Sequence, residues 1–272
     1  MEISLSGTKI YYHMIGTGTP VLMLHGWGVD HRIMCGCMEP VFKRGLNGYQ
    51  RIYMDLPGMG KSKESDSIKN SDDMLEIIAQ FIDAILPDDE FLLAGESYGG
   101  YLARGLVKLR PNQVLGLLLI CPLVIPGYRK GNVPELKVME SDDLFLAELS
   151  EQERSYFEFI TIIRTIAVWE RFKCDVYEAL LHQNSHFLNE VLDGAFSYDV
   201  DALDKPFDKP CLILTGRNDT EVGYQDQFKL LDNYISASYM VFDRAGHNLQ
   251  IEQQEQFVTA VSEWIKSHYP TA

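Results

Sequence analysis

The stretch "FLLAGESYGG", residues 91–100, places an apolar run directly before a serine that stands between two glycines. An apolar run of this length is typical of a strand that is buried on both faces. Gly95 and Gly99 carry no Cβ, so the backbone is free to turn sharply and to pack closely against its neighbours. Residues 101–111 follow with leucines at helical spacing and end in a proline. The stretch therefore predicts a strand, a tight turn with Ser97 at its apex, and a helix.

A serine on such a strand–turn–helix, with the pattern G-x-S-x-G, is typical of a nucleophile elbow. The turn lifts the hydroxyl of Ser97 above the end of the sheet, and the helix N-terminus points at negative charge that develops beside it. The same pattern also arises by chance in loops, where the serine is only a small turn residue. A nucleophilic role requires a base, an acid and an oxyanion hole from the rest of the chain.

Length and composition describe an ordinary globular chain. Its 272 residues suffice for one α/β domain with an insertion or for two small domains. A net charge of −15 predicts a surface that repels phosphate backbones and anionic membranes, so neither nucleic acid nor a membrane is expected as a partner. The N-terminus has no signal-peptide pattern, and the longest apolar stretch, residues 114–127, is too short to span a bilayer. These features predict a cytoplasmic protein.

Three patterns are similar to metal or nucleotide sites but are incomplete. The five cysteines are scattered and odd in number, so they are expected to be free thiols rather than a disulfide framework or a metal site. His182 and His186 lie one helical turn apart but lack the glutamate of a zinc-protease motif. "DLPGMGKS", residues 55–62, lacks the first glycine of a phosphate loop and is not followed by a helical pattern. We expect neither a metal nor a cofactor.

The first half of the chain alternates apolar strand patterns with helical patterns. Strands are expected at residues 8–16, on an edge of the sheet, and then at residues 20–28, 50–58, 91–94 and 114–121. An amphipathic helix is expected over residues 71–86, with Ser71 as its N-cap. Strands separated by helices predict a doubly wound, mostly parallel α/β sheet, in which ligands lie at the carboxyl ends of the strands.

The second half begins with a change of pattern. From about residue 124 to residue 205 the chain reads as helices without strands, and one of these helices opens with a capping box of Ser150 and Glu153. The alternation then resumes, with strands expected at residues 211–215 and 238–242, a helical stretch between them, and a last helix over about residues 248–268. The predicted domains are a core, residues 1–123 and 206–272, and an inserted helical cap, residues 124–205.

Two more strand ends carry titratable side chains. Asp219 ends the stretch "CLILTGRND", and His247 ends the stretch "SYMVFDRAGH". Both follow a predicted strand at its carboxyl end, so both are expected at the same rim as Ser97. There an imidazole would take the proton of the serine, and a carboxylate would hold the imidazole in the required tautomer. The alternative is that Asp219 only caps a turn and His247 only caps a helix, but the order serine, aspartate, histidine is the one that nucleophile-elbow enzymes use.

Together these motifs resemble the α/β-hydrolases, and in particular the capped serine hydrolases that include bacterial carboxylesterases. The resemblance spans nearly the whole chain and is carried by "HGWG" at 25–28, "DLPGMGKS" at 55–62, "GESYGG" at 95–100, and the pair "GRND" and "AGH". It implies the α/β-hydrolase fold with a cap. It also implies that His25 orders the loop of the oxyanion hole, whereas Asp55 is expected to form a turn.

The resemblance further implies a role for each residue of the site. Ser97 is implied as the nucleophile, His247 as the base and acid, and Asp219 as the acid that orients the imidazole. The backbone N–H groups of Trp27 and Tyr98 are implied as the oxyanion hole. An aspartate at the elbow would indicate a dehalogenase or an epoxide hydrolase, and the serine argues against both. Some relatives carry the orienting acid after the preceding core strand, where this chain has only "ICPL".

The sequence therefore predicts a serine hydrolase that acts on esters or related acyl compounds through an acyl-enzyme intermediate. A thioesterase, an amidase or a carbon–carbon bond hydrolase would use the same residues, and a non-catalytic small-molecule receptor on this fold is the alternative of a different class. The aromatic residues of the cap are expected to roof a mainly apolar pocket for a small-molecule acyl substrate, and some of them are expected to form the core of the cap itself: Phe157, Phe159, Trp169, Phe172 and Phe187. Trp27, Phe157 and Trp169 are the candidate substrate-binding side chains. The sequence does not indicate an oligomeric state.

Overall fold

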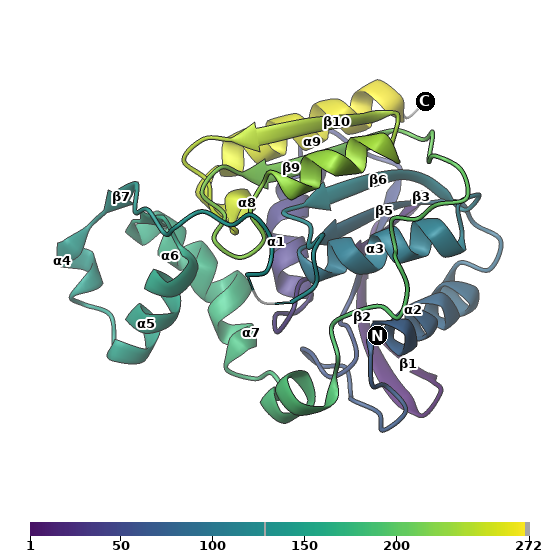
Figure 1. Ribbon diagram of the computed structural model, residues 1–272, viewed down its shortest axis with the longest axis horizontal. Coiled ribbons are helices and arrows are strands. Elements are labelled where there is room, and N and C mark those ends of the chain that lie inside the picture. The colour runs from purple at the N-terminus through teal and green to yellow at the C-terminus, as the bar shows by residue number, and fades with distance from the viewer. Residues whose placement is uncertain (128, 270–272) are drawn as a thin grey trace.

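The computed structural model describes residues 1–127 and 129–269 and is built around one eight-stranded sheet (Figure 1). Its strands are β1 (Glu2–Leu5), β2 (Thr8–Ile15), β3 (Thr19–Leu24), β4 (Tyr49–Met54), β5 (Phe91–Glu96), β6 (Val114–Ile120), β9 (Cys211–Gly216) and β10 (Ala237–Phe242). They lie in the order β1-β2-β4-β3-β5-β6-β9-β10. The β1–β2 and β2–β4 pairs are antiparallel, and all other neighbours in this sheet are parallel. The predicted mostly parallel sheet is confirmed.

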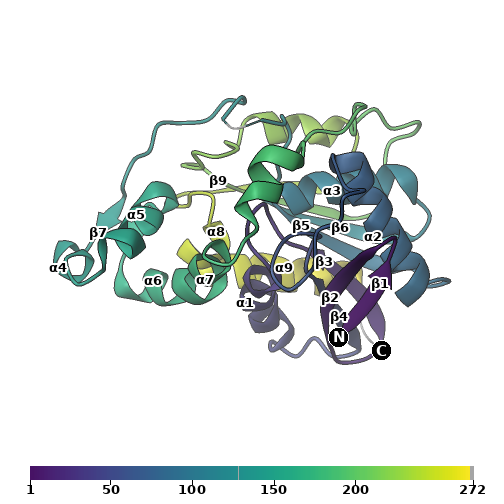
Figure 2. The same ribbon diagram turned by 90° about the horizontal axis from the view of Figure 1, so that it is seen from below.

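Helices cover both faces of the sheet (Figure 2). α1 (His31–Phe42) and α9 (Gln254–His268) pack on one face, and α2 (Ser71–Ile85) and α3 (Tyr98–Leu109) pack on the other. A one-turn helix, α8 (Leu249–Glu252), precedes α9, and a 3₁₀ helix (Asp226–Asp232) connects β9 to β10. Each face holds its own apolar cluster between helices and strands, which is the packing of a doubly wound domain. No helix within the described ranges combines the length and the apolar character that a membrane span requires.

Three details of the core differ from the sequence-based predictions. β2 is not an edge strand, because the short strand β1 pairs with it and takes the edge. The N-cap of α2 is Asn70, whose side chain accepts a hydrogen bond from Asp73 N, whereas the hydroxyl of Ser71 bonds to the hydroxyl of Tyr98. The last helix is interrupted at Gln253, which separates α8 from α9.

Between β6 and β9 the chain leaves the main sheet and forms a helical layer beyond the carboxyl ends of the strands, coloured teal to green in Figure 1. We call residues 124–205 the helical insertion. Its elements are β7 (Glu140–Ser141), α4 (Asp143–Leu146), α5 (Glu151–Ile160), β8 (Ile163–Arg164), α6 (Ile166–Phe172), a π-helix (Lys173–Tyr177), α7 (Glu178–Leu180) and a second π-helix (Phe187–Val191). The predicted capping box of Ser150 and Glu153 is confirmed.

The helical insertion was predicted to have no strands, and this is wrong because it contains one short pair of strands. β7 and β8 pair in parallel over two residues each, which is too short for a periodic pattern in the sequence. The domain boundaries at residues 124 and 205 stay a prediction. Tyr128 of the predicted cap and residues 270–272 of the predicted core lie outside the described residues.

The parallel register of the sheet gathers the predicted site at one rim. β3, β5, β9 and β10 all run in the same direction, so the loops that follow them emerge side by side. These loops begin at the strand ends Leu24, Glu96, Gly216 and Phe242. Residues that lie far apart in the sequence therefore meet where the helical insertion faces the sheet.

Candidate active site

Ser97 occupies a strained turn between β5 and α3. Its backbone has φ 51° and ψ −114°, and a positive φ of this size is uncommon for a residue with a side chain. The N–H of Ser97 donates to Ile120 O at 2.9 Å, which fixes the turn against β6. A Cβ on Gly95 would lie 2.4 Å from Gly99 O, and a Cβ on Gly99 would lie 2.3 Å from Leu24 O. The close packing that the sequence predicted for the two glycines is therefore present.

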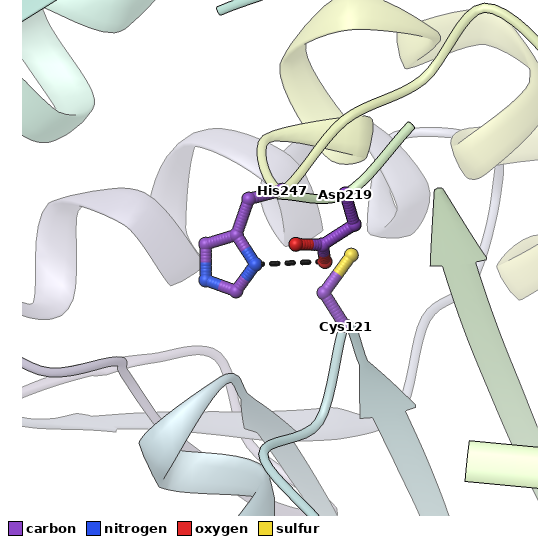
Figure 3. Close-up of side chains that lie close together, drawn as sticks. All are labelled: Cys121, Asp219 and His247. Atoms are coloured by element: carbon purple, nitrogen blue, oxygen red, sulfur yellow. Dashed lines mark hydrogen bonds and ion pairs between the residues drawn. The ribbon is translucent and has the colours of Figure 1, made fainter. Parts of the chain in front are cut away.

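Ser97, His247 and Asp219 form one hydrogen-bonded chain. His247 Nε2 lies 3.0 Å from Ser97 Oγ, and His247 Nδ1 lies 2.8 Å from Asp219 Oδ2, the contact drawn in Figure 3. The other oxygen of Asp219 accepts from Glu221 N at 2.9 Å and Val222 N at 3.0 Å, which fixes the carboxylate. Because a carboxylate only accepts, Nδ1 carries the proton and Nε2 is left to accept from the serine hydroxyl. The arrangement fits a nucleophile, a general base and an orienting acid.

The surroundings of His247 favour its protonated form. Burial by itself lowers the pKa of an imidazole, but the charge of Asp219 and the hydrogen bond with it act in the opposite direction. Cys121 and Glu96 add to this effect, and the net result raises the pKa of His247 well above its usual value. An imidazolium that forms when the histidine takes a proton is therefore stabilised at this position.

Glu96 places a second carboxyl group beside His247. Its Oε1 lies 3.6 Å from His247 Nε2, on the side of the ring that faces Ser97. Its Oε2 is buried without a hydrogen-bond partner and lies against Gly26, where a Cβ would approach it to 2.3 Å. Burial, reinforced by the charge of Asp219, raises the pKa of Glu96 to about 7 although His247 opposes the rise. The sequence reasoning missed this residue, although an acid in an otherwise apolar strand was visible.

Cys121 lies behind the pair of His247 and Asp219. It follows β6 with φ 41°, is fully buried, and points its sulfur toward the Asp219 carboxylate (Figure 3). Burial raises the pKa of this thiol to about 12, so the sulfur is protonated at neutral pH and adds no charge to the site. The three side chains bring possible ligand atoms within 4.8 Å of one another, but a proton already joins Nδ1 to the carboxylate.

The loop after β3 and the first turn of α3 offer two backbone donors beside Ser97. The N–H groups of Trp27 and Tyr98 donate to no other group in the described part of the chain. His25 holds the loop: its Nδ1 lies 2.8 Å from Gly26 O, and its Nε2 accepts from Leu56 N at 2.9 Å. Two unused donors near a nucleophile are what an oxyanion hole requires. The assignment of Trp27 and Tyr98 to that role stays a prediction.

A cavity of about 760 Å³ lies above Ser97 between the core and the helical insertion. Its lining consists of Trp27, Ser97, Tyr98, Leu123, Pro126, Gly127, Lys130, Ile160, Asn189, Leu192, Asp193, Gly194, Ala195, Glu221, Val222 and His247. Ser97 and His247 thus open into a space that is walled by aliphatic, aromatic and a few charged side chains. A second hollow of about 400 Å³, lined by Glu39 and Arg51 among others, contains none of the predicted site residues.

Of the three predicted substrate-binding side chains, only Trp27 lines this cavity. Phe157 and Trp169 are buried within the helical insertion, where their rings lie 5.2 Å apart and both pack against Phe172. Their assignment to the pocket is therefore wrong. A thin helical layer needs an apolar core of its own, and these aromatic rings form it. The insertion instead lines the cavity through Pro126, Gly127 and Lys130 near its start, through Ile160, and through a short segment around Leu192 that has no periodic pattern.

The other residues that the sequence singled out make contacts that are typical of structural residues. Asp55 accepts from His31 N and from Lys61 N, both at 2.8 Å, so its carboxylate ties two loops together. The ammonium of Lys61 lies over the ring of Tyr11, 4.6 Å from its centre, and does not point into a phosphate cradle. His182 lies in the turn after α7, and its Nδ1 bonds to the backbone carbonyl of Glu178 in that helix. All five cysteines are free thiols, as predicted.

Comparisons with known proteins match this chain to hydrolases. A family model described as "Alpha/beta hydrolase family" matches residues 21–260. A pimeloyl-[acyl-carrier protein] methyl ester esterase of Legionella pneumophila (strain Corby) is 26% identical over 261 residues, which cover 95% of this chain and 100% of that protein. A 2-hydroxy-6-oxo-6-(2'-aminophenyl)hexa-2,4-dienoic acid hydrolase of Metapseudomonas resinovorans is 23% identical over 277 residues, which cover 97% of this chain and 89% of that protein. The crystal structure of an alpha/beta superfamily hydrolase from Oenococcus oeni PSU-1 matches with a TM-score of 0.86 and 29% identity, over 98% of both chains.

Proposed function

The chain belongs to the alpha/beta hydrolase family, and on that basis we propose that it is a serine hydrolase that cleaves carboxylic esters through an acyl-enzyme intermediate. One observation carries the proposal: the hydrogen-bonded chain from Ser97 through His247 to Asp219 opens into the cavity. A serine alone is a poor nucleophile at neutral pH, and this contact supplies the base that activates it.

In the first half of the reaction, His247 Nε2 takes the proton of Ser97 while Oγ attacks the carbonyl carbon of the ester. The negative charge that moves onto the carbonyl oxygen is held by two backbone N–H groups, that of Trp27 in the loop after β3 and that of Tyr98 at the start of α3. The imidazolium, stabilised by Asp219, then gives its proton to the leaving alkoxide, and the acyl group remains on the serine.

In the second half, a water molecule takes the place of the alcohol. His247 Nε2 accepts a proton from the water, whose oxygen attacks the acyl carbonyl, and the proton then returns to Ser97 Oγ as the acid leaves. In the free site the surroundings of His247 raise its pKa, so the deprotonated imidazole is a stronger base than a free histidine.

Esters are the preferred substrate class for two reasons. Several curated relatives, such as the Legionella pneumophila protein, are named methyl ester esterases. The cavity also offers an aliphatic wall for an acyl chain, formed in part by Leu123, Ile160, Leu192 and Val222. We further propose that the helical insertion acts as a cap that selects the acyl group. Thioesters, amides and carbon–carbon bonds remain alternatives that the same side chains would serve.

A substrate panel tests the proposal. p-Nitrophenyl esters of graded acyl length are compared with matching thioesters and anilides, using wild type, Ser97→Ala and the exposed-serine control Ser67→Ala. We expect ester hydrolysis by wild type and the control, and a loss on the order of 10⁴-fold in kcat for Ser97→Ala. A wild-type protein that neither hydrolyses any member of the panel nor reacts with a fluorophosphonate would instead be a receptor.

A further inference from the structure

α8 lies at the junction between the core and the helical insertion (Figures 1 and 2). It contacts α6 of the insertion on one side and α9 of the core on the other. The last residue of α8, Glu252, is only 8% exposed. A buried carboxyl group is unfavourable unless it is well hydrogen-bonded, so its partners indicate why it is there.

The two oxygens of Glu252 bond to different parts of the molecule. Oε2 accepts from Gly246 N at 2.6 Å, one residue before His247. Oε1 accepts from Ile162 N at 2.8 Å and from Ile163 N at 3.4 Å, where α5 gives way to β8 in the insertion. One carboxylate thus joins the loop of the catalytic histidine to a segment that lies far away in the sequence.

The same segment of the insertion reaches the cavity. Ile160 lines the cavity, two residues before Ile162. Its carbonyl oxygen lies 3.6 Å from the position that a Cβ on Gly246 would occupy, so the insertion and the histidine loop are also in close contact. A displacement of this wall by a substrate would therefore pull on the carboxylate that holds the histidine loop.

We propose that Glu252 is a positioning residue that couples the acyl-cavity wall at Ile160 to the orientation of His247. The inference rests on the proposed function, because it assigns His247 as the base. Glu252 does not line the cavity and makes no hydrogen bond to Ser97 in the described part of the chain, so it acts through the N–H groups of Gly246 and Ile162. An acyl group that fits against Ile160 leaves both hydrogen bonds of Glu252 in place. An acyl group that displaces the cavity wall at Ile160 moves the imidazole away from the serine hydroxyl.

Glu252→Gln separates this role from simple stabilisation. A carboxamide has the shape of the carboxyl group, but its NH₂ only donates and would face either Gly246 N or Ile162 N. One of the two contacts is therefore lost while the volume is kept. Glu252→Asp keeps an acceptor on both oxygens but shortens the side chain. Glu255→Gln, on the exposed first turn of α9, is the matched control.

The experiment measures two quantities on folded protein at about pH 8, above the pKa of about 7 to which burial raises the carboxyl group of Glu252. The first is the rate of fluorophosphonate labelling, which reports the alignment of His247 with the serine. The second is the ratio of kcat/KM for a long and a short p-nitrophenyl ester. For Glu252→Gln we expect labelling to slow by about 10-fold or more and the ratio to change by about 3-fold or more. Glu252→Asp should fall between wild type and Glu252→Gln, and the control should equal wild type.

The coupling is overturned if either quantity stays within about twofold of wild type in folded Glu252→Gln, since a purely structural residue would lower only the Tm. If Glu252→Gln does not fold, Glu252→Asp is used instead, and the coupling is overturned if either of its two quantities equals that of the Glu255→Gln control. Failure of the proposed function has a different signature: the wild-type protein itself would then not be labelled, and the inference about Glu252 would fall with it.

Discussion

Asp219 and Glu96 both lie within reach of the His247 ring, but their hydrogen bonds differ. The carboxylate of Asp219 accepts two backbone N–H groups in addition to the imidazole, whereas Oε2 of Glu96 has no partner. Hydrogen-bond donors stabilise the ionised form of a carboxyl group, and burial without donors favours the protonated form. We therefore assign the orientation of the imidazole to Asp219, and to Glu96 only an influence on its charge.

The first prediction concerns Asp219. Asp219→Asn keeps the size of the side chain but favours the wrong tautomer of His247, so kcat should fall on the order of 10⁴-fold, as the equivalent substitution does in the serine-protease triad. Asp243→Asn, at an exposed site on the neighbouring loop, should leave kcat unchanged. The measurement is kcat from steady-state kinetics on folded variants. Near-wild-type activity of Asp219→Asn would mean that Asp219 does not orient His247.

The second prediction concerns pH. Only the neutral imidazole accepts the serine proton, and the surroundings raise the pKa of His247, so kcat/KM should fall as the pH drops through a value above 6.5. Above about pH 7, where Glu96 is ionised, its negative charge favours the imidazolium, so Glu96→Gln should move the acid limb to lower pH. The pH profile of the exposed control Glu263→Gln should superimpose on that of the wild-type protein. An acid limb that Glu96→Gln leaves in place, or moves upward, contradicts this role of Glu96.

The site residues differ in how far the sequence reveals them. Ser97, Asp219 and His247 each follow a strand pattern and stand in a recognisable motif. The sequence alone therefore predicts that these three residues lie close together. Glu96 also lies in the motif, but its burial depends on Gly26 from a different loop, which no local pattern describes. Glu252 is a charged residue on a short helix, and only the folded chain brings its carboxyl group within hydrogen-bonding distance of Ile162 N.

Among the elements of the fold, the main sheet and the helical insertion differ in predictability. The central strands β3, β5, β6 and β9 are short, mostly apolar runs, and their length and the glycines and prolines near them distinguish them from buried helices. The insertion is a thin layer in which Phe157, Trp169 and Phe172 pack against one another, and none of the three lines the cavity. Phe157 and Trp169 were misassigned because an apolar side chain in a helix gives no sign of which neighbour it packs against.

The third prediction follows from this correction. Leu192→Ala enlarges the cavity, so it should shift the relative kcat/KM for long and short acyl groups by about 1–3 kcal/mol in favour of long ones. Phe157→Leu alters the core of the insertion instead, so it should lower the free energy of unfolding by about 1 kcal/mol and leave the acyl-length ratio unchanged. Substrate series and urea denaturation measure the two effects. An acyl-length shift in Phe157→Leu with none in Leu192→Ala would restore the original assignment.

For the molecule as a whole, composition predicts the net charge but not its placement. The net charge of −15 creates a negative field around the protein, while the cavity lining contains a lysine as well as two acids. A field of this sign repels anionic substrates over distances comparable to the Debye length, which is about 10 Å at 0.1 M salt. The rate with an anionic substrate therefore depends on the balance between this field and the lysine of the cavity.

The fourth prediction tests the long-range field. An ester with a free carboxylate at the far end of its acyl chain should be a poorer substrate than the uncharged ester of equal length at low salt. Raising the ionic strength from about 0.02 M to about 0.3 M screens the repulsion, so the anionic-to-neutral ratio of kcat/KM should rise about twofold or more. A ratio that falls with salt would mean that the lysine of the cavity attracts the carboxylate and outweighs the net charge.

The proposed chemistry requires that Ser97 becomes acylated during turnover. Mass spectrometry detects this intermediate when the protein is quenched in acid while it hydrolyses an ester chosen for slow deacylation, and peptide mapping then locates the modification. We expect a mass increase of one acyl group, located on the peptide that contains Ser97 and absent from Ser97→Ala. Hydrolysis without any acyl adduct, or an adduct on another residue that persists in Ser97→Ala, would rule out Ser97 as the nucleophile.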